Sequence, residues 1–240
     1  MKNKTGKVYI IGAGPGDPEL ISVKGLKLLK RADCILYDFL SAPELLNHAK
    51  SGCEKICVGK KDGIHLKEQE GINRLLYTKA AVHKTVIRLK GGDPFLFSRG
   101  SEEARYLKKR GIAIEVIPGI TSAFAGPLSF GIPLTVKNRI QSVAMIAGRK
   151  KDINAQIEAP QCGTLVYLMA VANIANVVKA LRKSGRSEDT PCAFIEKATR
   201  KDERITLATI HTIEKEARRS RVKPPAVLIV GEAVNYIEGK

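Results

Sequence analysis

Short apolar runs that alternate with helical patterns are the feature that most constrains how this chain can fold. Each run in the first half ends in glycine, aspartate or a turn, which is typical of buried strands. Between them, the segment 101–111 begins with serine and two acids and ends in Lys-Lys-Arg before Gly111, which matches the preferences of both helix ends. The first half is therefore predicted to be α/β with a mostly parallel sheet. Its strand candidates are KVYIIG (7–12), CILYD (34–38), KICVG (55–59), TVIRLKGGD (85–93) and IEVIPG (114–119).

A polar stretch, GIPLTVKNRIQS at residues 131–142, interrupts this pattern before a second series of strands begins. The last of these strands follow one another with short connections, which predicts a mixed sheet. We expect two α/β domains, an N-terminal one over residues 1–136 and a C-terminal one over 137–240, with the ligand site in the cleft between them. The later strand candidates are SVAMIAG (142–148), TLVYLMA (164–170), PCAFIEKA (191–198), RITLATI (204–210) and PAVLIVG (225–231).

The charge balance is strongly basic, with 41 Lys and Arg against 24 Asp and Glu and a formal net charge of +17. Such a balance indicates an anionic partner, which the charge alone leaves open among nucleic acid, a membrane surface and a polyanionic small molecule. Aromatic residues make up only 5% of the chain and do not interleave with the basic runs, so the sequence gives little support to a base-stacking surface.

Targeting and cysteine patterns add two expectations. No apolar run approaches the roughly 20 residues that span a bilayer, and the N-terminal segment has no apolar stretch of the signal-peptide kind, so we expect a cytoplasmic protein. The five cysteines are scattered and odd in number, which argues against a disulfide framework. Cys53 and Cys57 have no second Cys or His pair to complete a zinc site, so no metal is predicted.

The loop after the first strand, GAGPGDPEL (12–20), tests the possibility of a dinucleotide site. The dinucleotide fingerprint is G-x-G-x-x-G, whereas the glycines here are spaced G-x-G-x-G. Pro15 removes a backbone N–H from the loop, and Asp17 and Glu19 place negative charge where a pyrophosphate needs the opposite. The loop therefore favours a ligand without phosphates, with a simple turn as the alternative.

Two further loops follow predicted strands. Gly91, Gly92 and Asp93 come after the fourth strand, and Thr121 and Ser122 follow the fifth. Because the carboxyl ends of parallel strands meet at one edge of a sheet, the three loops are expected to form a polar pocket there.

An ordered set of motifs resembles the tetrapyrrole methylase family over essentially the whole chain. RLKGGDPFxF points to the branch of the family that methylates uroporphyrinogen III. The motifs are GAGPGDPEL, YD (37–38), GK (59–60), QExIN (69–73), RLKGGDPFxF (88–97), PGITSAxA (118–125), TLVYLMA, EKAT and PPAVLIVGEAV.

The resemblance implies the two-domain tetrapyrrole methylase fold and an S-adenosylmethionine-dependent C-methylation of uroporphyrinogen III at C2 and C7. The product would be precorrin-2, on the branch toward sirohaem and cobalamin, with S-adenosylhomocysteine as the spent cofactor. The eight carboxylates of uroporphyrinogen III would account for the basic charge, so neither nucleic acid nor membrane is expected as a partner. The family also implies a homodimer. NAD and iron chemistry are not expected, because the dehydrogenase and chelatase module of fused sirohaem synthases is not seen.

The resemblance also implies the site residues, none of which binds a metal. Asp38 would be the base that removes a proton from the macrocycle, with a loop cap as its alternative role. Lys60 would be the matching acid, with a solvated surface lysine as its alternative. Met169 would line the cofactor site, and the alternative is that its side chain only fills the core. The cofactor site would comprise Pro15, Gly91, Gly92, Asp93, Leu96, Thr121, Ser122, Met169, Ala198 and Ala226, and the substrate carboxylates would meet Arg88, Lys90, Arg99 and Lys60.

Some positions depart from the family pattern, among them Ser22, where threonine is usual, and Arg149, where histidine is usual. Arg149 bears on substrate handling. Three alternatives remain at this point: a methyltransferase for a later precorrin, a ribosomal RNA 2′-O-methyltransferase of the same fold, and a non-catalytic basic binding protein. RLKGGDPFxF argues against the first, the second needs a different loop at 91–97, and the third should not bind S-adenosylhomocysteine.

Overall fold

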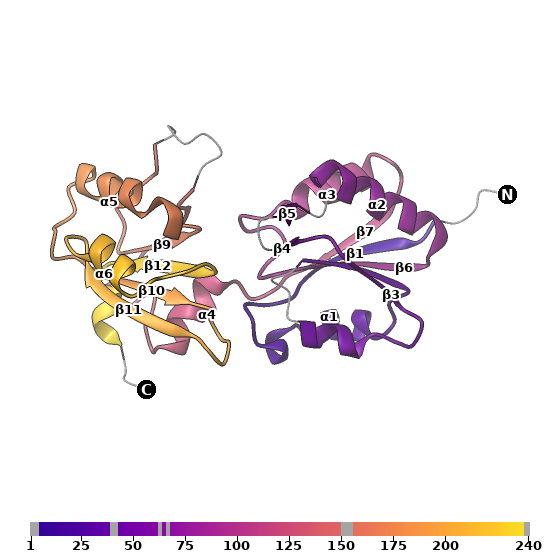
Figure 1. Cartoon of the computed structure of the whole chain (residues 1–240), viewed down its shortest axis with the longest axis horizontal. Helices are drawn as coiled ribbons and strands as arrows, with labels where there is room; N and C mark the ends of the chain where they lie inside the picture. Colours follow the sequence, from indigo (N-terminus) through magenta and orange to yellow (C-terminus); the bar gives the residue numbers. More distant parts are fainter. Residues whose placement is uncertain (1–4, 39–42, 62–63, 66–67, 150–155, 238–240) are drawn as a thin grey trace. The chain divides into compact units, whose positions relative to one another are not determined.

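The computed structural model divides the chain into two compact units, Met1–Thr121 and Ser122–Lys240 (Figure 1). No helix in the described part of the chain is both long and apolar enough to cross a membrane. The residues that the structure describes are 5–38, 43–61, 64–65, 68–149 and 156–237, without the side chains of residues 60, 61, 64 and 65.

The first unit contains a five-stranded parallel sheet in the order β3-β2-β6-β1-β7. Each predicted strand of the first half is present, and each is followed by a turn or loop, so the predicted parallel α/β arrangement is confirmed. The strands are β1 (Lys7–Gly12), β2 (Cys34–Tyr37), β3 (Glu54–Cys57), β6 (Thr85–Lys90) and β7 (Ala113–Ile117).

Helices cover both faces of this sheet, with α1 (Val23–Leu29) on one face and α2 (Gln69–Val82) and α3 (Gly100–Lys108) on the other (Figure 1). Strand residues alternate between the two faces, so Ile87 packs in the α1 layer and Val86 in the α2 and α3 layer. Ser22 caps α1 by accepting a hydrogen bond from the Gly25 N–H, a role that threonine also performs. Short elements complete the unit: η1 (Pro18–Leu20), η2 (Pro43–His48), β4 (Lys60–Lys61) and β5 (Ile64–His65).

The second unit contains a mixed sheet in the order β11-β10-β12-β9-β8. Only β8 and β9 are parallel, and the other pairs are antiparallel, as the short connections between the last strands predict. The strands are β8 (Val143–Ala147), β9 (Thr164–Leu168), β10 (Pro191–Glu196), β11 (Arg204–Thr209) and β12 (Ala226–Val230). The helices are α4 (Ser122–Ser129), η3 (Val171–Asn173), α5 (Ile174–Lys183), α6 (Ile213–Arg219) and η4 (Glu232–Tyr236).

The division between the units falls after Thr121 and not after residue 136, where the polar stretch suggested it. Helix α4 belongs to the second unit because Ala123 packs in its core against Val166 and Ala193. The polar stretch itself places Ile132 and Ile140 in that same core, so it is part of the second unit and not a linker. Because polar residues are spread through this stretch, its sequence pattern does not show that these two isoleucines are buried.

Candidate active site

Three strand-end loops of the first unit meet at the carboxyl edge of its sheet. Gly14 and Gly92 form an isolated bridge in which the Gly92 N–H donates to the Gly14 carbonyl over 2.7 Å. The Ala13 N–H donates to the Lys90 carbonyl over 2.7 Å, which binds the first loop to the end of β6. The expected gathering of these loops at one edge is therefore confirmed.

Glycine is needed where the three loops touch. A Cβ on Gly12 would lie 2.5 Å from the Cα of Gly119, and a Cβ on Gly119 would lie 2.3 Å from the Gly92 carbonyl oxygen. Both distances are too short for any side chain, so these backbones pack directly on one another. Gly92 has a positive φ of 66°, and a Cβ there would make only an ordinary contact, 3.9 Å from the Thr121 Cα.

Asp93 fixes the shape of the second loop. Its Oδ1 accepts hydrogen bonds from the N–H groups of Phe95 and Leu96 at 2.8 and 3.2 Å. Its Oδ2 accepts one from the Gly119 N–H at 3.1 Å, which ties the second loop to the third. The carboxylate thus has three backbone donors, a structural role in addition to the cofactor contact that the resemblance implied.

The remaining cofactor-site candidates of the first unit lie in these same loops. Pro15 and Leu96 are half-buried, and so is Gly91, which follows directly after β6. Thr121 is buried at the end of the third loop. Ser122 is the first residue of α4 in the second unit.

The candidates of the second unit gather at one edge of its own sheet. Met169 follows β9, Ala226 begins β12 and Ala198 lies just after β10. The register brings these ends together, since Leu168 is the partner of Val227 and Glu196 is the partner of Ala226. Their roles in binding a cofactor remain predictions.

Strained backbone marks this edge of the second sheet. Met169, Lys197 and Thr199 have φ values of 61°, 52° and 63°, in the left-handed region that non-glycine residues rarely adopt. Met169 is also 47% exposed, which is unusual for a large apolar side chain and excludes the alternative of a core position. Such strain commonly accompanies functional sites. Exposed Arg149 lies at the same edge, where the preceding Gly148 N–H donates to the Leu168 carbonyl over 2.7 Å.

Asp38, the candidate base, is held by a buried arginine. The Arg88 Nη2 donates to Asp38 Oδ1 over 2.5 Å, and Lys90 Nζ lies 3.8 Å from Asp38 Oδ2. The side chain of Arg88 is 2% exposed and that of Asp38 is 26% exposed. Asp38 therefore presents a partly accessible carboxylate on a rigid cationic support.

Glu103 supplies the counter-charge beneath that support. Its Oε1 lies 3.1 Å from Arg88 Nε and 3.3 Å from Lys90 Nζ, and it accepts a hydrogen bond from Gln69 Nε2 at 3.2 Å. The Glu103 side chain is fully buried, and its Oε2 has no hydrogen-bond partner among the described residues. This oxygen is an uncompensated buried acceptor, which makes the network costly to disturb.

The network separates the pKa values of its two cations. Burial lowers the pKa of Lys90, and the neighbouring Arg88 charge lowers it further. For Arg88, burial also disfavours the charge, but Glu103 and Asp38 outweigh it and the pKa of the guanidinium is raised. Arg88 consequently remains the permanent cation beside Asp38.

The structure changes the expected roles of the basic residues. Arg88 and Lys90 are buried in ion pairs, so the expectation that they meet substrate carboxylates is replaced by one of supporting Asp38. Arg99 is exposed and pairs with Glu102 over 2.9 Å. The backbone of Lys60 begins β4, but its side chain lies outside the described residues, so its predicted role as the acid stays a prediction.

No role was predicted from the sequence for Glu103, nor for Gln69, although Gln69 lies within the QExIN motif. One signal was available, because Arg88 and Lys90 share one face of an otherwise apolar strand. Two cations on a buried face require a buried counter-charge nearby.

The chain belongs to the tetrapyrrole methylases. The profile of this family, described as tetrapyrrole (corrin/porphyrin) methylases, matches residues 7–214. Two α/β units with a glycine-lined loop edge agree with that assignment, and membership makes the chain a methyltransferase.

Individual members of the family are similar to this chain over nearly its whole length. The chain is 46% identical to a uroporphyrinogen-III C-methyltransferase of Methanocaldococcus jannaschii, covering 98% of this chain and 100% of that protein. It matches the structure of uroporphyrin-III C-methyltransferase from Thermus thermophilus in complex with S-adenosylhomocysteine at a TM-score of 0.81 and 38% identity, covering 96% and 99% of the two chains. A cobalt precorrin-4 methyltransferase matches at a TM-score of 0.82 and 32% identity, covering 95% of each chain.

Proposed function

We propose that this chain transfers methyl groups from S-adenosylmethionine to C2 and C7 of uroporphyrinogen III, giving precorrin-2. The observation that carries the proposal is 46% identity to a uroporphyrinogen-III C-methyltransferase over 98% of this chain and 100% of that protein. The loop edge of the first unit supports it independently, because its glycines admit a ligand without offering a phosphate cradle.

The loop residues fit a nucleoside cofactor. No side chain covers the backbone at Gly92, where a Cβ would lie 3.9 Å from the Thr121 Cα, so a ligand can approach that backbone closely. Asp17 caps η1 by accepting from the Glu19 N–H at 2.8 Å, which leaves negative charge beside the loop and disfavours a phosphate-bearing ligand. The cofactor would supply an electrophilic methyl group with a good leaving group. The residues expected to hold it are Pro15, Gly91, Gly92, Asp93, Leu96, Thr121, Ser122, Met169, Ala198 and Ala226.

Asp38 is the residue proposed to remove the ring proton. When a substituted pyrrole carbon gains a methyl group, the macrocycle must lose a proton at another position so that its electrons reach the attacked carbon, and a carboxylate beside the macrocycle accepts that proton. Arg88 holds Asp38 in place through Oδ1, while a quarter of the carboxyl side chain stays accessible. Lys60 is proposed to return a proton as the acid.

Exposed cations would attract the substrate. Uroporphyrinogen III carries eight carboxylates, and the chain carries a net charge of +17. Because Arg88 and Lys90 are buried, exposed Arg99 and Arg149 are the proposed carboxylate contacts near the two loop edges. A homodimer and a cytoplasmic location remain predictions from the resemblance and the sequence.

The experiment is anaerobic incubation of the purified chain with S-adenosylmethionine and enzymatically generated uroporphyrinogen III, followed by mass spectrometry of the tetrapyrrole. A gain of two methyl groups is expected. A gain of only one would point to altered substrate handling, with Arg149 as the first position to revert to histidine. No gain by a chain that still binds S-adenosylhomocysteine would overturn the proposal.

The second candidate is methylation of a later precorrin, favoured by the close structural match to a cobalt precorrin-4 methyltransferase. The same assay with a precorrin-4 substrate distinguishes the two. The expected result is methylation of uroporphyrinogen III alone.

A further inference from the structure

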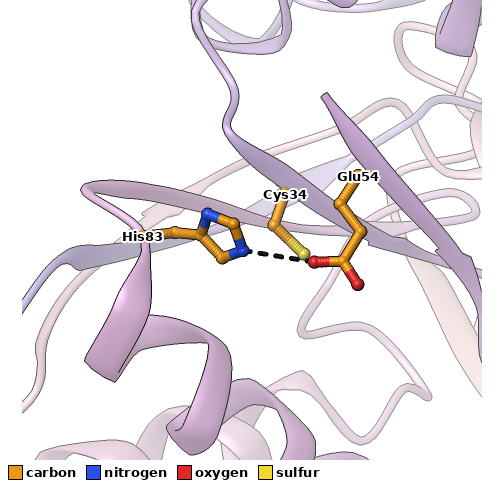
Figure 2. A group of neighbouring side chains, drawn as sticks. All are labelled: Cys34, Glu54 and His83. Carbon is orange, nitrogen blue, oxygen red and sulfur yellow. Dashed lines mark hydrogen bonds and ion pairs between the residues drawn. The ribbon is translucent and has the colours of Figure 1, made fainter. Parts of the chain in front are cut away.

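A thiol, a carboxylate and an imidazole meet at the amino ends of two strands, on the side of the sheet opposite the loop edge. Cys34 begins β2, Glu54 begins β3, and the two are direct partners in the parallel register. His83 ends α2 as its C-terminal cap and points toward the same place, as Figure 2 shows. One ligand atom from each residue lies within 4.8 Å of the other two.

The spacing of these atoms suits one small cation. His83 Nε2 lies 3.1 Å from Glu54 Oε2. Nitrogen and oxygen ligands at about 2.0–2.1 Å from a tetrahedral Zn²⁺ lie about 3.3 Å apart, so this pair is already at coordination distance. The thiol is the softer third ligand, and the open fourth position of such a site takes a water molecule.

The surroundings favour a cation on that side. His83 caps the C-terminus of α2, where its backbone N–H donates to the Lys79 carbonyl, and a helix C-terminus attracts positive charge. Glu54 Oε1 accepts a hydrogen bond from Lys79 Nζ at 2.6 Å, which leaves Oε2 to face His83. This contact orients the carboxylate as an outer-shell partner does in known metal sites. Glu54 and His83 are 40% and 27% exposed in their side chains, so an ion in solution has access.

Two effects oppose binding: the Lys79 ammonium group beside Glu54 repels a second cation, and the Cys34 thiol must lose its proton. Burial, together with the nearby Glu54 charge, raises the pKa of the Cys34 thiol to about 12, so the metal-free protein keeps the thiol proton. Binding of a divalent cation replaces that proton, which passes to solvent, and forms the sulfur–metal bond. Glu54 is already an anion, since Lys79 chiefly, and His83 to a smaller extent, lower its pKa against the opposing effect of burial.

We propose that Cys34, Glu54 and His83 form a binding site for a borderline-soft divalent cation, Zn²⁺ by the chemistry of its ligands. No sequence motif indicates this site, because the three residues lie far apart along the chain. The site joins β2, β3 and α2 at the edge opposite Asp38, so it would stabilise the first unit without entering the methyl-transfer chemistry. The inference is independent of the proposed function.

The test uses the full-length chain, stripped of metal with a chelator and titrated with Zn²⁺ by calorimetry and with Co²⁺ by absorption. We expect one Zn²⁺ per chain, a near-ultraviolet thiolate-to-cobalt charge-transfer band, and a Tm that rises with Zn²⁺ concentration. Loss of an outer-shell partner alone weakens metal affinity roughly 10–100-fold. His83→Ala, Glu54→Gln and Cys34→Ser should therefore each weaken Zn²⁺ binding at least about tenfold, and Cys34→Ser should abolish the charge-transfer band.

Matched controls come from the same unit. His48→Ala removes an exposed imidazole in η2, and Cys57→Ser removes a thiol at the far end of β3; both should bind Zn²⁺ as the parent chain does. The His83 side chain is partly exposed, so His83→Ala should fold and can test the proposal even if Cys34→Ser does not fold. Zn²⁺ binding that is absent in the parent chain, or unchanged in His83→Ala, would overturn the proposal.

Discussion

The Arg88 guanidinium reaches from β6 to the Asp38 carboxylate that follows β2, with Nη2 2.5 Å from Oδ1. The strands are paired in parallel with Leu36 opposite Arg88, and the Asp38 N–H continues the ladder to the Leu89 carbonyl at 3.2 Å. A carboxylate fixed in this way at both its backbone and its side chain has little conformational freedom to lose when a substrate arrives. This relationship underlies the first two predictions.

Replacing Asp38 by asparagine should remove the proposed base while keeping the shape of the side chain. General-base catalysis contributes roughly 10²–10⁴-fold, so we expect kcat to fall by about that factor. The measurement is the initial rate of tetrapyrrole methylation, with circular dichroism to verify folding. The control is Asp33→Asn, just before the opposite end of β2, where the carboxylate accepts from the Thr85 N–H and pairs with Lys50. Near-normal turnover in a folded Asp38→Asn chain would show that the base is elsewhere.

Replacing Glu103 by glutamine should destabilise the first unit. Removing one partner of a buried ion pair typically costs about 3–5 kcal/mol, because the remaining charges lose their compensation, and Arg88 and Lys90 would both be affected here. Urea denaturation measures the loss. Glu70→Gln is the matched control, since its pair with Arg74 lies on the exposed face of α2 and should matter little. Equal effects of the two substitutions would mean that the buried network contributes no stability of its own.

Stability should fall in acid partly through Glu115. Hydrogen bonds from Lys24 and Lys7 lower its pKa from 4.5 to about 2. Because the folded-state pKa is depressed, this contribution is fully present above about pH 4.5 and is lost as the pH falls toward 2. The Tm difference between the parent chain and Glu115→Gln should be constant from pH 7 to 5 and shrink below that. It should also shrink in high salt, since the pairs are accessible to solvent. A Tm difference that persists unchanged to pH 2 would contradict the prediction.

Replacing Met169 by glycine should destabilise the protein less than replacing it by valine. The left-handed backbone costs a non-glycine residue about 1–2 kcal/mol, which glycine recovers while adding about 0.5–1 kcal/mol of unfolded-state entropy. We therefore expect Met169→Gly to stay within about 1 kcal/mol of the parent chain, and β-branched Met169→Val to be clearly less stable. If the side chain lines the cofactor site, Met169→Gly also binds S-adenosylhomocysteine more weakly by calorimetry. Unchanged affinity would remove Met169 from the site.

The sequence was most informative where local chemistry decides structure. The strand-end loops at Gly12, Gly92 and Gly119 follow from apolar runs that end in glycine, and the failed dinucleotide spacing already pointed away from phosphate. The predicted boundary after residue 136 differs from the division after Thr121, because Ile132 and Ile140 are isolated apolar residues within a polar stretch and only their burial shows that they belong to the second core.

The buried network was less accessible to prediction. Glu103 stands in the first turn of α3, where an acid is expected for the helix dipole alone, and nothing in the local pattern shows that it faces Arg88. The positive φ of Met169 was equally hidden, because methionine has no preference for that conformation and the strain comes from the end of β9. Long-range partners and backbone strain are properties of the folded chain.

The contact of Gly12, Gly92 and Gly119 has a consequence for how such a chain can change over time. These residues come from three distant stretches of the sequence, yet no side chain separates their backbones. A side chain at Gly12 or Gly119 would displace the neighbouring backbone, so a substitution there requires a compensating change in the adjoining loop. The three loops are therefore expected to change together during evolution, although they lie far apart in the sequence.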